Sequence, residues 1–112
     1  IIDGTGNPWF VGDVAILNGK IAAIGLLSEA SAQKTIDATG KIVCPGFIDV
    51  HTHIERFALE IPTADNFIYD GVTTLITGNC GSSAMNLGEF LQKLSDKKPS
   101  PNIASLVGHN TI

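Results

Sequence analysis

Residues 45–53 of the 112-residue chain read Pro45-Gly46-Phe47-Ile48-Asp49-Val50-His51-Thr52-His53. The Pro-Gly pair is a turn former, and Phe47–Val50 is apolar except for Asp49, so we expect a buried strand to begin here. Side chains alternate across a strand, so His51 and His53 should point to the same side. Two imidazoles that converge at a strand end provide half of a typical metal site.

The chain after Pro45 alternates between strand and helix patterns. We expect strands over residues 47–50, 72–77 and 103–107, a mixed loop over 54–61, and a short helix over 64–70 with Thr63 as its cap and Gly71 as its left-handed end. A second helix carries an apolar stripe of Leu87, Phe90, Leu91 and Leu94. This alternation indicates parallel strands joined by helical crossovers.

The second helix also has start and stop signals. Asn86 and Glu89 have the spacing of a capping box, and Lys97 and Lys98 favour the negative end of the helix dipole. Proline residues at positions 99 and 101 end the helix.

Each expected parallel strand is followed by polar, reactive side chains. His51 and His53 follow the first, Cys80 the second and His109 the third. Counting by two along the second and third strands brings Cys80 and His109 to the same rim as the two histidines. Such residues gather at the carboxyl ends of strands in (β/α)₈ barrels and open α/β sheets, and three strands cannot close a barrel.

Residues 1–45 have a different, antiparallel pattern. Strands over 13–17 and 20–24 flank Asn18-Gly19, a strong signal for a two-residue hairpin. Two further short strands are expected over 35–37 and 42–44, on either side of a turn at Thr39-Gly40. The predicted fold class is therefore α/β, with a small antiparallel β-sandwich portion at 1–45 and the first three strands of a (β/α)₈ metal-dependent hydrolase barrel at 46–112.

Composition narrows the class of partner. A net charge of −4 argues against nucleic acid and anionic membranes as partners. No apolar run is long enough to span a bilayer, and no signal peptide is visible. Because the chain starts with Ile1 and ends at Ile112, we expect a piece of a longer protein. The compartment stays open, with the cytoplasm preferred and the periplasm as the alternative.

The sequence resembles the amidohydrolase superfamily, and within it the N-acyl-D-amino-acid deacylases. The resemblance covers nearly the whole chain, and four stretches carry it: Ile2-Asp3-Gly4-Thr5-Gly6, the hairpin at 13–25, the segment 45–53, and Gly71-Val72-Thr73-Thr74 with Gly78-Asn79-Cys80-Gly81. The last is the most specific, because few amidohydrolases have a cysteine in this context after the second strand. Where members often have aspartates directly after His-x-His, this chain has Ile54-Glu55-Arg56.

The resemblance implies a zinc hydrolase, with one or two Zn²⁺ ions, that removes the acyl group from a small-molecule N-acyl-D-amino acid. It assigns Cys80 as a zinc ligand and His51 and His53 to the second metal position. Further histidines and a catalytic aspartate are implied on later strands, beyond residue 112. We therefore expect the 112-residue fragment alone to be inactive.

Each candidate also has a structural interpretation. Cys80 is either a ligand or a buried, inert thiol. Asp49 either orients a histidine or is a buried carboxylate that ties strand ends together, and His109 either contacts metal or substrate or is a core histidine. Glu55 and Arg56 are expected to be solvated loop charges, with a substrate carboxylate as the alternative partner of Arg56. Cys44 is expected to be structural, with no bridge to Cys80.

Two other functions compete with deacylation. The first is hydrolysis of cyclic amides by a dihydroorotase-like or hydantoinase-like enzyme. Such enzymes typically use a carboxylated lysine where this chain has Cys80. The second is a non-catalytic α/β module that binds a metal or a partner.

Overall fold

A computed structural model describes all residues, Ile1–Ile112, and the chain divides into two compact units, Ile1–Pro45 and Gly46–Ile112. The first unit is built on one antiparallel hairpin, β1 (Asp13–Leu17) with β2 (Lys20–Gly25). Asn18 and Gly19 have φ values of 52° and 72°, which confirms the predicted turn because both positions of a type I′ turn need positive φ.

The two further strands predicted in the first unit do not form. The turn between them does: Thr39 N–H donates to Asp37 Oδ1 at 2.9 Å, and Gly40 has a φ of 72°. However, residues 42–44 have only one backbone hydrogen bond, from Ile2 N–H to the Val43 oxygen at 2.9 Å. A strand is stable only when its backbone groups pair with a neighbour, and residues 1–45 offer none at these positions. The prediction of strands at 35–37 and 42–44 was therefore wrong.

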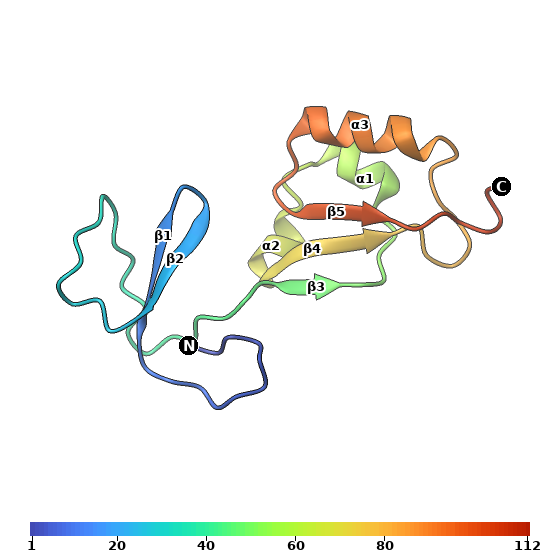
Figure 1. Cartoon of the computed structure of the whole chain (residues 1–112). Coiled ribbons are helices and arrows are strands. Elements are labelled where there is room, and N and C mark those ends of the chain that lie inside the picture. The colour runs from blue at the N-terminus through green and yellow to red at the C-terminus, as the bar shows by residue number, and fades with distance from the viewer. The chain divides into compact units, whose positions relative to one another are not determined.

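The second unit is a three-stranded parallel sheet in the order β3-β4-β5. Its strands are β3 (Phe47–Asp49), β4 (Val72–Thr77) and β5 (Asn102–Ser105), and their arrows point the same way in Figure 1. The predicted parallel pairing and helical crossovers are confirmed. β5 ends two residues earlier than predicted. Its register with β4 ends at Thr77 and Ser105, although Leu106 N–H still donates to the Thr77 oxygen at 2.8 Å.

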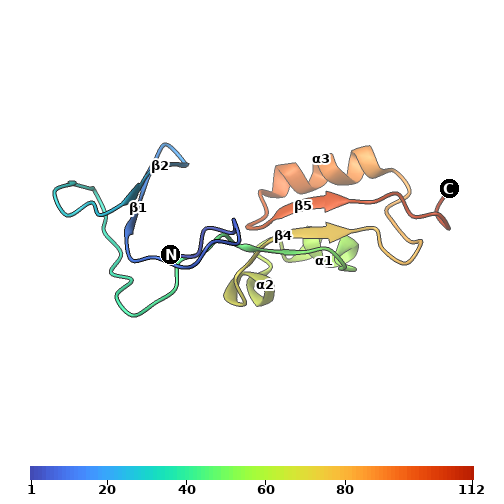
Figure 2. The ribbon, with the colours of Figure 1, turned by 60° about the horizontal axis from the view of Figure 1, so that its bottom comes forward.

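Three helices connect these strands (Figure 2): α1 (Glu55–Glu60), α2 (Asp65–Tyr69) and α3 (Leu87–Lys97). α1 corrects the predicted loop at 54–61. Ile54 and Ala58, four residues apart, are both buried, and Arg56 pairs with Glu60 at the same spacing. This helical periodicity was present in the sequence and could have identified the helix.

The predicted side-chain cap forms at the start of α3 but not at the start of α2. The Asn86 side chain accepts a hydrogen bond from Glu89 N–H at 3.0 Å, which confirms the predicted cap of α3, although the Glu89 carboxylate pairs with Lys93 instead of completing the box. Thr63 does not cap α2, because the chain enters that helix through Ala64 in a left-handed conformation with no side-chain cap. Gly71 has a φ of 81°, as its predicted left-handed role requires.

The core lies on one face of the parallel sheet. Leu75 of β4 is fully buried against Ile54, Ala58, Phe90 and Leu94, so α1 and α3 cover the same face. Burial of these apolar side chains stabilises the unit and fixes the strand ends from which polar residues project. None of the helices has the length and hydrophobicity that a membrane span requires.

Candidate metal centre

His51 and His53 lie just beyond the end of β3. Thr52 between them is buried while both histidines are exposed, so the predicted alternation continues past the strand. Their ring centroids are 5.4 Å apart with an angle of 68° between the ring planes, an edge-to-face arrangement. Both imidazoles therefore present nitrogen atoms to the same space.

Cys80 follows β4 and meets these histidines. The His51 Nε2 and Cys80 Sγ atoms are 3.3 Å apart, and one ligand atom from each of the three residues lies within 4.8 Å of the others. A tetrahedral zinc site with Zn–N near 2.0 Å and Zn–S near 2.3 Å requires ligand atoms about 3.5 Å apart. Imidazole nitrogen and thiolate sulfur are donors that zinc prefers, and the 3.3 Å between His51 Nε2 and Cys80 Sγ matches this spacing. For the pairs that involve His53, the structure sets an upper limit of 4.8 Å.

Local backbone geometry places Cys80 in this position. Cys80 has a φ of 54°, a left-handed conformation that is uncommon for a residue with a Cβ. Gly78 and Gly81 on either side have φ values of 80° and 77°. The Gly-Asn-Cys-Gly sequence therefore turns the chain sharply at the end of β4 and presents the thiol at the rim.

Asp49 and His109 lie outside this three-residue cluster. Asp49 is half-buried, and its Oδ1 accepts a hydrogen bond from His51 N–H at 3.0 Å, so it contacts the backbone of a candidate ligand. His109 is exposed in the segment after β5. Their proposed roles toward a metal or substrate stay predictions.

Glu55 is not the solvated loop charge that the sequence suggested. It is half-buried at the start of α1, and its Oε1 accepts a hydrogen bond from Gly78 N–H at 2.8 Å. Burial tends to raise the pKa of this carboxyl group, but hydrogen bonding from Thr77 and from backbone N–H groups, together with the charge of His53, lowers the pKa below its usual value. A charged Glu55 therefore anchors the segment that leads to Cys80.

Arg56 is a solvated charge, as predicted, although it lies in α1 instead of a loop. Its guanidinium pairs with Glu60 at 3.0 Å along α1, and its side chain is 83% exposed. Cys44 and Cys80 are both free thiols, as expected, and Cys44 is exposed.

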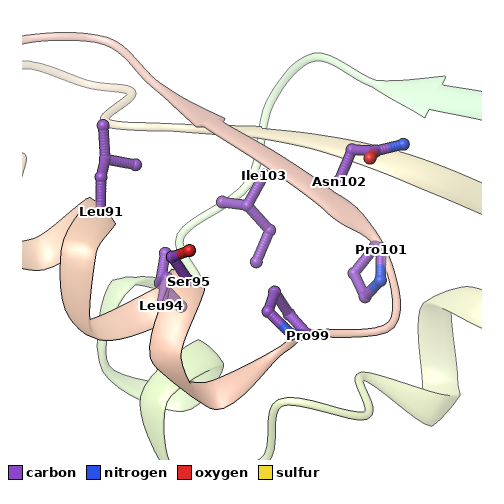
Figure 3. A pocket seen from close by; sticks show the side chains of 7 residues that line it. All are labelled: Leu91, Leu94, Ser95, Pro99, Pro101, Asn102 and Ile103. Atoms are coloured by element: carbon purple, nitrogen blue, oxygen red, sulfur yellow. The ribbon is translucent and has the colours of Figure 1, made fainter.

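A cavity of about 490 Å³ in the second unit is separate from this centre. It lies between the end of α3 and the start of β5, and Pro99 and Ile103 point into it (Figure 3). The candidate ligands follow the carboxyl ends of β3 and β4, so the cavity belongs to the opposite end of the parallel sheet. Its lining includes no histidine, cysteine or carboxylate.

Comparison with known proteins matches this arrangement of elements to solved structures. A D-aminoacylase whose binuclear metal centre was studied superimposes with a TM-score of 0.90 at 35% identity, over 98% of this chain and 28% of that one. The N-acyl-D-glutamate deacylase of Bordetella bronchiseptica, solved with zinc and a phosphonate inhibitor, gives 0.90 at 37% identity, over 96% and 28%.

Sequence relatives agree. The D-aminoacylase of Alcaligenes xylosoxydans xylosoxydans is 34% identical over all of this chain, which spans 28% of the length of that relative. The sequence profile of the Amidohydrolase family matches residues 34–111. The chain therefore belongs to the amidohydrolase family.

Proposed function

We propose that the complete protein containing this chain is a zinc-dependent hydrolase that deacylates N-acyl-D-amino acids. The observation that carries the proposal is the convergence of His51, His53 and Cys80, whose ligand atoms lie within 4.8 Å of one another. Imidazole nitrogen and thiolate sulfur are ligands that zinc prefers. The identity of 34–37% to D-aminoacylases and an N-acyl-D-glutamate deacylase supports the substrate class.

In this proposal the chain contributes metal-binding residues from two strand ends. His51 and His53 would donate ring nitrogens, and Cys80 would donate a thiolate sulfur, to one or two Zn²⁺ ions. When bound, zinc acts as a Lewis acid that polarises a carbonyl oxygen and makes water a nucleophile near neutral pH. Asp49 would keep the His51 backbone in place through its hydrogen bond to the N–H.

The same proposal assigns residues 46–112 to the first three strands of a (β/α)₈ barrel and residues 1–45 to part of a β-sandwich. The parallel order β3-β4-β5, with α1 and α3 on one face, is consistent with such a barrel. Because the chain spans 28% of its solved relatives, the remaining ligands and the general base would come from other parts of the protein. We expect residues 1–112 alone to be inactive.

The test uses the complete protein with its zinc removed by a chelator and then restored. Turnover of N-acyl-D-amino acids should disappear with the metal and return with Zn²⁺, while the N-acyl-L enantiomers should be poor substrates under both conditions. Full activity of the metal-free protein, or no turnover of any N-acyl-D-amino acid by the zinc-loaded protein, would overturn the proposal.

One comparison favours a second candidate function. The chain is 48% identical to the adenine deaminase of Listeria monocytogenes over 68 residues, which cover 59% of this chain and 11% of that protein. Adenine therefore belongs in the same assay. Release of ammonia from adenine, without deacylation, would favour a deaminase built on the same metal-binding residues.

A further inference from the structure

The two histidines of the candidate metal centre lie where the regular sheet has already ended. The pairing of β3 with β4 stops at Asp49 and Leu75, and residues 50–54 belong to no strand or helix. The positions of His51 and His53 relative to Cys80 must therefore depend on interactions other than a β-ladder.

Thr52 provides those interactions from between the histidines. Its N–H and its Oγ1 both donate to the Ile76 oxygen of β4, at 3.0 and 2.9 Å. Its own carbonyl oxygen accepts from Thr77 Oγ1 at 3.2 Å and from Asn79 Nδ2 at 3.3 Å. Four hydrogen bonds thus tie this single residue to the end of β4.

The Asn79 side chain donates to the carbonyl oxygens of both Thr52 and Ile76. Its Nδ2 donates to Thr52 O and also to Ile76 O, at 3.0 Å, and Asn79 directly precedes Cys80. The amide therefore joins the residue between the two histidines to the residue before the cysteine. No other side chain bridges the two ligand-bearing segments through both of these oxygens.

Burial makes these hydrogen bonds hard to replace. Thr52 is 6% exposed and Thr77 is fully buried. A carbonyl that loses its donor in such surroundings is poorly compensated by water, so the main chain must shift to find another partner. Such a shift would move His51 and His53 directly.

We propose that Thr77 and Asn79 are positioning residues that set the distance at which His51, His53 and Cys80 meet. This inference rests on the proposed metal-binding function. Residues that orient metal ligands without touching the metal commonly change metal affinity by about 10- to 100-fold when they are replaced. Neither residue would contact the zinc ion itself.

The principal test replaces Asn79 by leucine, which has a similar size, no hydrogen-bond donor and no charge. In the complete protein, Asn79→Leu should bind Zn²⁺ about 10- to 100-fold more weakly in competition with a chelator. The Co²⁺-substituted variant should show an altered visible spectrum, because the geometry of the sulfur and nitrogen donors changes. Loss of fold alone would not change the spectrum of the protein that remains folded.

A matched control lies at the other end of the parallel sheet, where Asn102 begins β5. Asn102 Nδ2 donates to the Thr73 oxygen of β4 at 3.3 Å, so it makes the same kind of contact away from the candidate ligands. Asn102→Leu should leave zinc affinity and the Co²⁺ spectrum unchanged. Equal losses in the two asparagine variants would overturn the proposal, because a general loss of strand stability would then explain both.

A second pair of variants tests the hydroxyl of Thr77. Thr77→Val keeps the shape and removes the hydroxyl that donates to Thr52 O and accepts from Ile54 N–H, whereas Thr77→Ser keeps that hydroxyl. Zinc affinity should fall in the valine variant and recover in the serine variant. If Asn79→Leu does not fold, this pair decides the question, and wild-type affinity in Thr77→Val would overturn the role of Thr77.

A third variant separates this inference from the function on which it rests. Cys80→Ser should lose tightly bound zinc. If Cys80→Ser keeps it, the proposed metal centre fails. If Cys80→Ser loses zinc while Asn79→Leu and Thr77→Val keep wild-type affinity and spectrum, only the positioning role fails.

Discussion

Residues 1–45 and 46–112 contain comparable β-strand patterns, yet they differ in how much of that pattern becomes structure. In the first unit only the hairpin forms, and no side chain is buried. In the second unit each predicted strand pairs, and helices cover Leu75 on one face of the sheet. The difference shows that strand patterns become strands where residues 1–112 also supply the pairing partner and a covering layer.

Two glycines with similar backbone geometry give the largest expected contrast between the units. Gly78 and Gly19 have φ values of 80° and 72°. A Cβ at Gly78 would lie 2.2 Å from the Leu106 backbone oxygen, whereas one at Gly19 would meet no atom within 4 Å. Gly78→Ala should therefore lower the free energy of unfolding by about 4 kcal/mol or more. Gly19→Ala should lower it by about 1 kcal/mol, from the left-handed conformation alone.

Urea unfolding of the complete protein would measure both losses. Equal values for the two variants would mean that β4 and β5 separate easily at this point. The inference that the backbones of Gly78 and Leu106 lie too close for a side chain at position 78 would then be wrong.

The core gives the next largest contrast. Leu75 is fully buried, whereas Ile21 of the hairpin is 66% exposed. Leu75→Ala should lower the free energy of unfolding by about 3 kcal/mol, because it removes apolar contacts and leaves a cavity. Ile21→Ala should change it by less than about 0.5 kcal/mol. A loss of several kcal/mol in Ile21→Ala would show that the hairpin is covered by a partner in the complete protein.

The smallest contrast compares the two predicted helix caps. Asn86 accepts the Glu89 N–H, and Asn86→Ala should lower the free energy of unfolding by about 1 kcal/mol. Thr63 makes no cap hydrogen bond, so Thr63→Ala should have almost no effect. Urea unfolding of the two variants measures this difference. A larger loss of unfolding free energy in Thr63→Ala than in Asn86→Ala would support Thr63 as the cap of α2.

Much of the second unit could be predicted from sequence because its signals are local. Val72–Thr77 is β-branched at every position except Leu75 and is bounded by glycines, and the bounds of β4 agree with the prediction. The prediction of a mixed loop at 54–61 is wrong, because Ile54 and Ala58 have helical spacing and α1 buries both. The two failed strands of residues 1–45 depended on partners that a local pattern does not reveal.

The convergence of His51, His53 and Cys80 followed from two simple rules: alternation along a strand and the shared edge of parallel strand ends. The hydrogen bonds that hold Thr52, between the two histidines, could not be predicted in this way. Thr77 and Asn79 meet Thr52 across 25 and 27 residues of sequence, and those contacts depend on the register of β3 with β4. A shift of one residue would turn the same side chains to the other face.

The proposed metal centre uses Cys80 of the second unit and not Cys44 of the first. Zinc content of the purified complete protein, measured by elemental analysis for Cys80→Ala and Cys44→Ala, distinguishes the two thiols. We predict that Cys44→Ala retains the wild-type zinc content and that Cys80→Ala loses its tightly bound zinc, because a thiolate ligand is removed. Full zinc occupancy in Cys80→Ala would contradict the account.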